Sequence, residues 1–411
     1  MKLKCIALIL AGGHGKRLGA LTNYYSKPAI PFGGKTRLID FSLNNCIKSG
    51  IKTIGVLSQY FTSDLNTYIN NIYGWRPEEK GVYTLTPKNE KSPYCGTADA
   101  VYRNMEFIDK HDSEYVLILS GDHIYDMDYQ KMIDFHKKTG AELTIASTTV
   151  PIREASRFGV METSNSNGRV SGFEEKPLRP KNNLVSMGIY LFKWRTLRKY
   201  LLMDCKDVHS RHDFGQNIFL EMLSNNEAIY AYRYDGYWRD VGTVDSLWEA
   251  NMDQIANHSN LRPEQNKKDI INPYEIDAFN TISHHAEVRD SIISEGCVIF
   301  GKVGHSILSN SVTVCADAEV ENSVLMPGVY IGNNVKIYNT VVGSRAKIMD
   351  NTIIGSDDGI DYFVDHKVCS KGISLIEPWL YVDRDMELQK NSQVCQSKMD
   401  DFNLLLTQNA I

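Results

Sequence analysis

The sequence lacks long hydrophobic runs and blocks of like charge. The first apolar stretch, Cys5–Leu10, is too short for the core of a signal peptide, and no run reaches the length of a membrane-spanning helix. The 45 basic and 50 acidic residues are interspersed and give a formal net charge of -5. No basic stripe is available to follow a nucleic-acid backbone or an anionic membrane. We therefore expect a cytoplasmic protein with small-molecule ligands, without nucleic-acid or membrane partners.

Closely spaced cysteine pairs are also missing. The eight cysteines are scattered from Cys5 to Cys395 without the short spacings of zinc sites or disulfide frameworks. We expect them to be reduced thiols, most of them buried by packing.

Length and composition predict a globular protein with two domains. The 411 residues exceed the size at which one hydrophobic core usually stops growing. Hydrophobic residues make up 42% and charged residues 23% of the chain, which leaves enough apolar surface for a large core.

Short apolar runs alternate with amphipathic stretches over the first 234 residues. This pattern predicts an α/β domain with a largely parallel sheet. The strands are expected at residues 5–10, 53–57, 115–119, 143–150 and 184–192. The helices are expected at residues 38–49, 98–108, 129–139 and 214–223.

A repeat of 17 residues replaces this pattern toward the C-terminus. Three aliphatic columns recur at this spacing, formed by Val303, Val320, Ile337 and Ile354, by Val314, Ile331 and Ile348, and by Leu308, Leu325 and Val342. Three inward apolar positions per coil are what a triangular parallel β-helix needs. A β-sandwich with coincidental spacing is the alternative.

The change of pattern defines four segments. We expect a catalytic domain at residues 1–256, a polar linker at 257–283, the β-helix at 284–356, and a less regular extension at 357–411.

A glycine-rich turn follows the first expected strand. The stretch 11–18 contains Gly12, Gly13 and Gly15 ahead of Lys16 and Arg17, and its backbone N–H groups could cradle a phosphate. A dinucleotide fingerprint would need glycine in place of Leu18, and a Walker A loop would need glycine in place of Ala29. The turn therefore indicates a phosphate ligand without either of these folds.

Two aspartates stand where a nucleotide-bound metal could bind. Asp122 follows a strand at the edge where open α/β sheets bind ligands, and Asp240 is the plausible second ligand for Mg²⁺. The alternative for each is a turn-forming aspartate. Lys176, at the end of another expected strand, could hold a sugar phosphate or could be an ordinary solvated lysine.

The chain resembles the bacterial glucose-1-phosphate adenylyltransferases (ADP-glucose pyrophosphorylases) over nearly all of residues 1–355. The resemblance rests on long collinear motifs at residues 10–18, 27–41, 96–98, 120–125, 154–159, 175–177, 186–190, 212–215 and around Asp240.

The resemblance implies a Rossmann-like nucleotidyltransferase domain with a mostly parallel sheet, followed by a left-handed parallel β-helix. It also implies catalysis of ADP-glucose formation from ATP and glucose 1-phosphate with Mg²⁺, for glycogen or α-glucan synthesis. The family usually forms tetramers, so a homotetramer or a hetero-oligomer with a related subunit is expected.

The same resemblance implies roles for individual residues. Asp122 and Asp240 would hold Mg²⁺, Asp122, Arg17 and Lys27 would be catalytic, and nucleotide contacts would come from Gly12, Gly13, Gly15, Gly96 and Thr97. The glucose 1-phosphate pocket would be formed by Tyr94, Gly159, Glu175, Lys176 and Ser186.

Three other functions are weighed against this one. A pyrophosphorylase using UTP, dTTP or GTP would share the glycine turn and lysines, but the adenylyl-type motifs disfavour it. A catalytically weak regulatory subunit is disfavoured because Asp122, Lys176 and Asp240 are all present. An acyltransferase acting through the β-helix would need a catalytic histidine, and only the lone His305 lies in the repeat.

Overall fold

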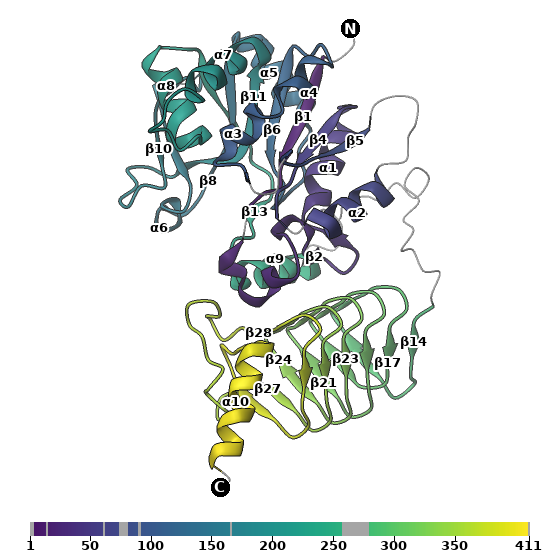
Figure 1. Cartoon of the computed structure of the whole chain (residues 1–411). Coiled ribbons are helices and arrows are strands. Elements are labelled where there is room, and N and C mark those ends of the chain that lie inside the picture. Colours follow the sequence, from purple (N-terminus) through teal and green to yellow (C-terminus); the bar gives the residue numbers. More distant parts are fainter. Residues whose placement is uncertain are drawn as a thin grey trace. The chain divides into compact units, whose positions relative to one another are not determined.

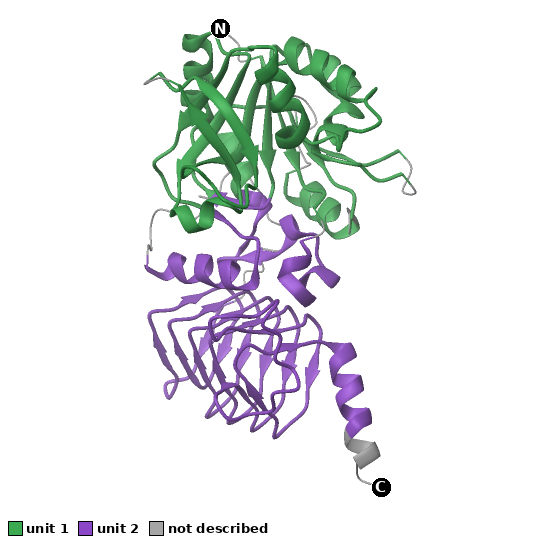
Figure 2. Cartoon of the chain, turned by 90° about the vertical axis from the view of Figure 1, so that its left-hand side faces the viewer, with its two compact units in different colours: residues 1–13, 41–121, 125–238 green, residues 14–40, 122–124, 239–411 purple. Residues whose placement is uncertain are grey.

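The computed structural model describes residues 4–13, 15–60, 62–73, 81–88, 92–164, 167–256 and 279–409. The chain forms two compact units, each assembled from separate segments (Figure 2). The first contains Met1–Gly13, Phe41–Gly121 and Tyr125–Trp238, and the second contains His14–Asp40, Asp122–Ile124 and Arg239–Ile411. A single cut after residue 256 therefore does not separate these units. Most of the expected linker, residues 257–278, lies outside the described residues. Among those described, no helix has the length and apolar character needed to cross a membrane.

A mixed nine-stranded sheet is the centre of the first unit (Figure 1). Its main path runs in the order β10-β9-β11-β6-β1-β4-β5, and β8 pairs with β11 and β12. The strands are β1 (Cys5–Leu10), β4 (Ile54–Leu57), β5 (Val82–Leu85), β6 (Tyr115–Ser120), β8 (Leu143–Thr149), β9 (Gly159–Thr163), β10 (Val170–Glu175), β11 (Leu184–Lys193) and β12 (Ile229–Arg233).

The sheet is parallel only in part. β6, β1, β4 and β5 run parallel, and β8 is parallel to β12, whereas β11 is antiparallel to β6, β8 and β9. β1 is buried along almost its whole length, in keeping with its continuous apolar sequence in the parallel part. The expectation of a largely parallel sheet therefore holds for only one part of the observed sheet.

The helices of this unit are α1 (Ile39–Lys48), α2 (Thr62–Ile72), α3 (Thr97–Tyr102), α4 (Met105–Asp109), α5 (Tyr129–Thr139), α6 (Ile152–Ala155), α7 (Trp194–Asp204) and α8 (Phe219–Ser224), with a π-helical turn η3 (Phe214–Ile218) before α8. The first two residues of α1 belong to the second unit. The helix expected at 98–108 is divided into α3 and α4. At the break, the Asn104 side chain donates to the carbonyl oxygen of Ala100 and to the hydroxyl of Tyr94, so it competes with the regular helical bonds.

Outside the β-helix, the second unit contains short elements near the N-terminus of the chain and one longer helix. These are η1 (Lys16–Asn23), η2 (Lys27–Ala29), β2 (Pro31–Phe32), β3 (Thr36–Arg37) and α9 (Val244–Ala256). Two further short strands, β7 (His123–Tyr125) and β13 (Trp238–Asp240), pair with each other.

A parallel β-helix of three six-stranded sheets makes up most of the second unit (Figure 1). The first sheet contains β14 (Thr281–Ile282), β17 (Val298–Ile299), β20 (Thr313–Val314), β23 (Tyr330–Ile331), β26 (Lys347–Ile348) and β29 (Tyr381–Val382). The second contains β15 (Glu287–Arg289), β18 (Lys302–Gly304), β21 (Glu319–Glu321), β24 (Lys336–Tyr338), β27 (Ile353–Ser356) and β30 (Glu387–Gln389). The third contains β16 (Ile292–Ile293), β19 (Ile307–Leu308), β22 (Val324–Leu325), β25 (Thr340–Val342), β28 (Ser374–Ile376) and β31 (Gln393–Val394).

The 17-residue columns of the sequence are the stacked interior of this β-helix. Val303 pairs with Val320, Val320 with Ile337, and Ile337 with Ile354, and all four are buried. Several corners carry residues in the left-handed region, which Asn and Asp tolerate better than most side chains. One such column, again spaced by 17, is formed by Asp317, Asn334 and Asn351.

The β-helix extends well beyond its expected end at residue 356. An insertion at 357–373 separates β27 from β28, after which the coils resume as far as Val394 and are followed by α10 (Gln396–Asn409). Ile348 pairs with Val382, 34 residues later. The insertion is as long as one coil, so the spacing between paired residues doubles from 17 to 34 at this point. The 17-residue repeat is therefore not visible in the sequence beyond residue 356.

Candidate functional site

Asp122, His123 and Asp240 form a cluster of metal-ligating side chains in the second unit. One ligand atom from each lies within 4.8 Å of the others. The pairing of β7 with β13 brings them together, because Asp122 directly precedes β7 and Asp240 ends β13. The Nε2 atom of His123 is 3.6 Å from an oxygen of each aspartate. Two carboxylates suit a hard cation such as Mg²⁺, whereas imidazole is the less usual ligand for it.

Lys27 is the cation that faces both aspartates. Its Nζ atom lies 2.6 Å from Asp122 Oδ2 and 3.3 Å from Asp240 Oδ1. The lysine side chain is only 9% exposed. Burial would lower the pKa of Lys27, but the two carboxylates outweigh it and leave the pKa above its ordinary value. The lysine is therefore held charged, although it is buried.

Arg17 lies beside the same aspartate pair. A Cβ atom at Gly242 would stand 2.9 Å from Arg17 Nη2 and 3.2 Å from Asp240 Oδ2, so both side chains lie close to the backbone there. Gly15, with φ of +62°, packs closely against Lys27 and Thr22. The structure thus brings Arg17, Lys27, Asp122 and Asp240 together within one unit.

The β-helix anchors the segment that carries Arg17. Asn23, at the end of η1, donates to Glu377 Oε1 at 2.9 Å, and the backbone N–H of Gln396 donates to Glu377 Oε2 at 2.7 Å. A Cβ at Gly19 would overlap the side-chain oxygen of Gln393. These contacts join η1 to the last coil and to the start of α10.

In the first unit, Gln59 links the glycine turn to Tyr94. Its Nε2 atom donates to the carbonyl oxygen of Gly12 at 3.0 Å, and its Oε1 atom accepts from the backbone N–H of Tyr94 at 2.7 Å. Among the described residues, its chain neighbours aside, no atom lies within 4 Å of the Cβ position of Gly13. Burial raises the pKa of the Tyr94 hydroxyl, which accepts from Asn104.

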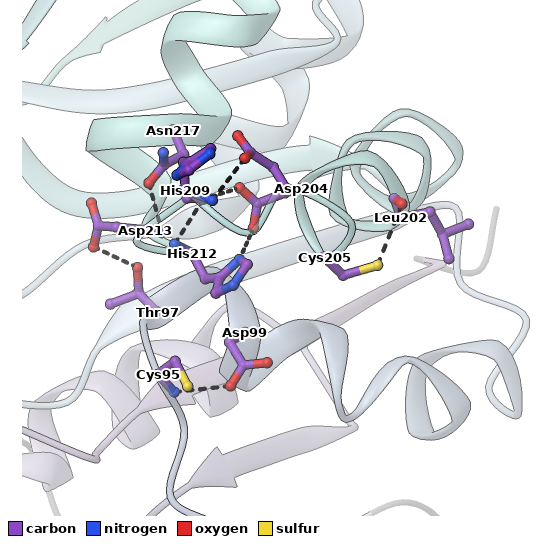
Figure 3. A network of polar contacts seen from close by, with 12 residues as sticks. Cys95, Thr97, Asp99, Leu202, Asp204, Cys205, His209, His212, Asp213 and Asn217 are labelled. Atoms are coloured by element: carbon purple, nitrogen blue, oxygen red, sulfur yellow. Dashed lines mark hydrogen bonds and ion pairs between the residues drawn. The ribbon is translucent and has the colours of Figure 1, made fainter.

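Gly96 and Thr97 contact the segment 211–214. A Cβ at Gly96 would overlap the carbonyl oxygens of Arg211 and His212. The Thr97 hydroxyl donates to Asp213 Oδ2 at 2.9 Å (Figure 3). It also accepts from the backbone N–H of Phe214 at 3.1 Å. In this structure, both residues therefore make contacts within the protein that hold the start of α3.

Three of the expected sugar-binding residues form a row across adjacent strands. Glu175 of β10 is the direct partner of Gly159 of β9. Val185 of β11 is the partner of Val160, and the same antiparallel register brings Ser186 level with Gly159. Lys176 follows Glu175 in the left-handed region, with φ of 49°, and its Nζ atom is 3.4 Å from Glu175 Oε1. Its side chain is 65% exposed, so it remains available to an anion.

Glu175 is enclosed by backbone. A Cβ atom at Gly159 would lie 2.9 Å from Glu175 Oε2, and one at Gly215 would lie 2.5 Å from it. Burial raises the pKa of Glu175 above its ordinary value, Lys176 opposes this rise and Asp213 adds to it.

Sequence reasoning did not identify His123, Gln59 or Asp213 as parts of these sites. His123 was visible only as the neighbour of Asp122. The contacts of Gln59 and Asp213 join residues 35 and 116 positions apart, so no local pattern indicated them.

Comparison with known proteins agrees with this geometry. The sequence matches the nucleotidyl transferase family over residues 6–257 and the GlmU-like C-terminal hexapeptide family over residues 278–376. It is 47% identical over 367 residues to proteins named glucose-1-phosphate adenylyltransferase from Bacillus mycoides, Bacillus cereus and Bacillus anthracis. Each alignment covers 88% of this chain and 97% of the relative. The chain is therefore a nucleotidyltransferase and belongs to the glucose-1-phosphate adenylyltransferase family.

Proposed function

We propose that the protein makes ADP-glucose and diphosphate from ATP and α-D-glucose 1-phosphate, and so supplies the glucosyl donor for glycogen or α-glucan synthesis. The observation that carries the proposal is the cluster of Asp122, Asp240 and Lys27 in a chain of this family. Two close carboxylates would repel a triphosphate unless cations balance them, so the cluster favours a metal-dependent phosphate reaction.

Asp122 and Asp240 would hold Mg²⁺ in this proposal. When bound, the ion would neutralise phosphate charge and stabilise the diphosphate leaving group. Lys27 and Arg17 would contribute positive charge toward the triphosphate as negative charge develops on it. Lys27 is suited to this role because it is already charged and fixed by its two carboxylate partners.

The sugar phosphate would supply the nucleophile. One of its oxygens would attack the α-phosphorus of ATP and form a new O–P bond. The bond between the α-phosphorus and the oxygen that bridges it to the β-phosphorus would break, which releases diphosphate. A phosphate monoester is already ionised at neutral pH, so no general base is required. Catalysis would then depend mainly on positioning and charge neutralisation.

The row of Gly159, Glu175 and Ser186 would hold the glucose hydroxyls, with Tyr94 nearby in the same unit, and Lys176 would hold the phosphate. The support is the register of β9, β10 and β11 and the exposure of the Lys176 ammonium group. On the nucleotide side, we assign Gly12, Gly13 and Gly15 to the phosphates and Gly96 and Thr97 to the rim of the pocket.

Assembly as a homotetramer, or with a related subunit, and a cytoplasmic location complete the proposal. The assembly rests on the family resemblance, and the location rests on the lack of long hydrophobic runs in the sequence. A catalytically weak subunit is the second candidate, but it is disfavoured because Asp122, Asp240 and Lys176 are all present in the chain.

The direct test is to incubate purified protein with ATP, glucose 1-phosphate and Mg²⁺ and to identify the products. We expect ADP-glucose and diphosphate in equal amounts, and no turnover when the metal is removed with a chelator. Sugar-nucleotide formation from another triphosphate alone, or no product from any of them, would contradict the proposal.

A further inference from the structure

Asp204 and His212 form a partly buried polar pair outside the residues assigned to substrates. The Nδ1 atom of His212 lies 2.7 Å from Asp204 Oδ2 (Figure 3). The side chains of Asp204 and His212 are 10% and 23% exposed. Asp204 ends α7, and His212 lies in the connection between α7 and η3.

The pair holds the backbone in an unusual conformation. His212 has φ of 52°, in the left-handed region that residues other than glycine occupy uncommonly, Asn, Asp and His more often than the rest. The hydroxyl of Ser210 donates to Asp204 Oδ1 at 2.6 Å and accepts from the backbone N–H of His212 at 2.9 Å. Both oxygens of one carboxylate therefore hold this turn.

The turned backbone supports two of the proposed substrate-binding regions. The carbonyl oxygen of His212 accepts from the backbone N–H of Ala98 at 2.8 Å, at the start of α3, next to Gly96 and Thr97. Asp213 accepts from Thr97 on one oxygen and from the backbone N–H of Gly215 on the other, at 3.0 Å.

Gly215 contacts Glu175 of the proposed sugar site. Its Cβ position lies 2.5 Å from Glu175 Oε2, so the backbone at residue 215 packs directly against that carboxylate. A continuous series of contacts thus leads from Asp204 through His212, Asp213 and Gly215 to Glu175.

We propose that Asp204 and His212 are positioning residues for the glucose 1-phosphate site. They hold residues 212–215 so that the Glu175 carboxylate is fixed for the sugar while the start of α3 is fixed beside it. The inference rests on the proposed function, because Glu175 is assigned to the sugar there.

The test is a double-mutant cycle with separate Michaelis constants for the two substrates. We expect Asp204→Ala and His212→Ala each to raise the KM for glucose 1-phosphate about tenfold or more. The KM for ATP should rise by a clearly smaller factor, because residues 212 and 213 also contact Ala98 and Thr97 on the nucleotide side. The double variant should be no worse than the poorer single variant. Equal rises for both substrates, or additive losses in the double variant, would overturn the proposal.

Further variants separate this proposal from a loss of folding. His212→Gly removes the imidazole and leaves a residue that tolerates the left-handed backbone conformation. It should show the same rise in the KM for glucose 1-phosphate even if His212→Ala is insoluble. Asp112→Ala is the matched control, because Asp112 is an exposed residue of the same unit with φ of 46°. It should leave both Michaelis constants unchanged.

A Glu175→Gln variant tests the underlying site assignment. If it raises the KM for glucose 1-phosphate while the Asp204 and His212 variants do not, the positioning proposal is wrong and the proposed function stands. If Glu175→Gln leaves that KM unchanged, the sugar does not bind at Glu175 and the positioning proposal is wrong as well.

Discussion

The ammonium group of Lys27 lies 2.6 Å from a carboxylate oxygen of Asp122 and also contacts Asp240 at 3.3 Å. One buried cation thus balances part of the charge of two partly buried acids. An incoming metal ion would meet the same two carboxylates, so the lysine and the metal would share them. Replacing any one of Lys27, Asp122 and Asp240 should therefore change how tightly the cluster binds a metal ion.

Asp122→Asn should reduce turnover at saturating substrate by about a hundredfold or more without unfolding the protein. A neutral amide is a poor ligand for Mg²⁺, and the loss is comparable to that of one preorganised electrostatic contact. Steady-state diphosphate release and the unfolding temperature measure the two effects. Asp126→Asn is the control, because Asp126 lies four residues after Asp122, directly beyond the end of β7, and its side chain is 58% exposed. Near-normal turnover by Asp122→Asn would refute the metal assignment.

Lys27→Met should lower turnover but strengthen metal binding by the free protein. Removing the cation removes its repulsion of a metal at the same carboxylates, which should tighten Mn²⁺ binding about fivefold or more. Mn²⁺ titration followed by electron paramagnetic resonance measures the affinity, with the exposed Lys110→Met as the control. Weaker Mn²⁺ binding in Lys27→Met would show that Lys27 supports the metal site instead of competing for it.

Lys176→Ala should raise the KM for glucose 1-phosphate much more than the KM for ATP. The lost charge-assisted contact is worth about 1.5–3 kcal/mol if it is largely desolvated in the complex. Initial rates with each substrate varied in turn give the two constants, and the exposed neighbour Lys181 provides a matched Lys181→Ala control. Equal rises in both constants would place Lys176 elsewhere.

His136 should make the protein less stable as the pH falls from about 6.5 to about 4. Burial, the largest cause, together with Lys193 and Lys137, lowers the pKa of His136 to about 4, and Glu142 opposes this shift. Because the folded pKa is below the unfolded value, the stabilising effect is complete above about 6.5 and is lost toward 4, at most about 3 kcal/mol. Unfolding midpoints at pH 7.5 and 5.0 should differ less in His136→Gln than in the original protein. An unchanged difference would show that other groups cause the acid sensitivity.

The sequence predicted five strands of the nine-stranded sheet from their apolar runs, namely β1, β4, β6, β8 and β11, and the end of β10 before Lys176, but it missed β5, β9 and β12. The strand Cys5–Leu10 and the helix Tyr129–Thr139 have the expected bounds, and Asp128 and Gly140 cap that helix as the sequence rules require. The division of the helix at 98–108 was not predictable, because it depends on hydrogen bonds from Asn104 that reach Tyr94 in another segment.

The β-helix was predictable from its period but its end was not. The insertion at 357–373 doubles the spacing between paired strands, so aliphatic columns that continue in space are interrupted in sequence. Likewise, the antiparallel strand β11 cannot be distinguished from a parallel one by its own residues, since direction is set by pairing.

The candidate site was predictable where motifs are local and was missed where contacts are long-range. Asp122 and Asp240 were expected together, and β7 and β13 do bring them together. Gln59, Asp204 and His212 act on other segments through side-chain and backbone hydrogen bonds, and only the folded chain reveals which groups these are.

The most direct test of the central claim is the rate of diphosphate release with glucose 1-phosphate and each of ATP, UTP, dTTP and GTP. The account predicts that ATP has the highest kcat/KM by about tenfold or more, that the product is ADP-glucose, and that Asp122→Asn abolishes most of the signal. A higher kcat/KM for another triphosphate, or diphosphate release that does not depend on Asp122, would contradict it.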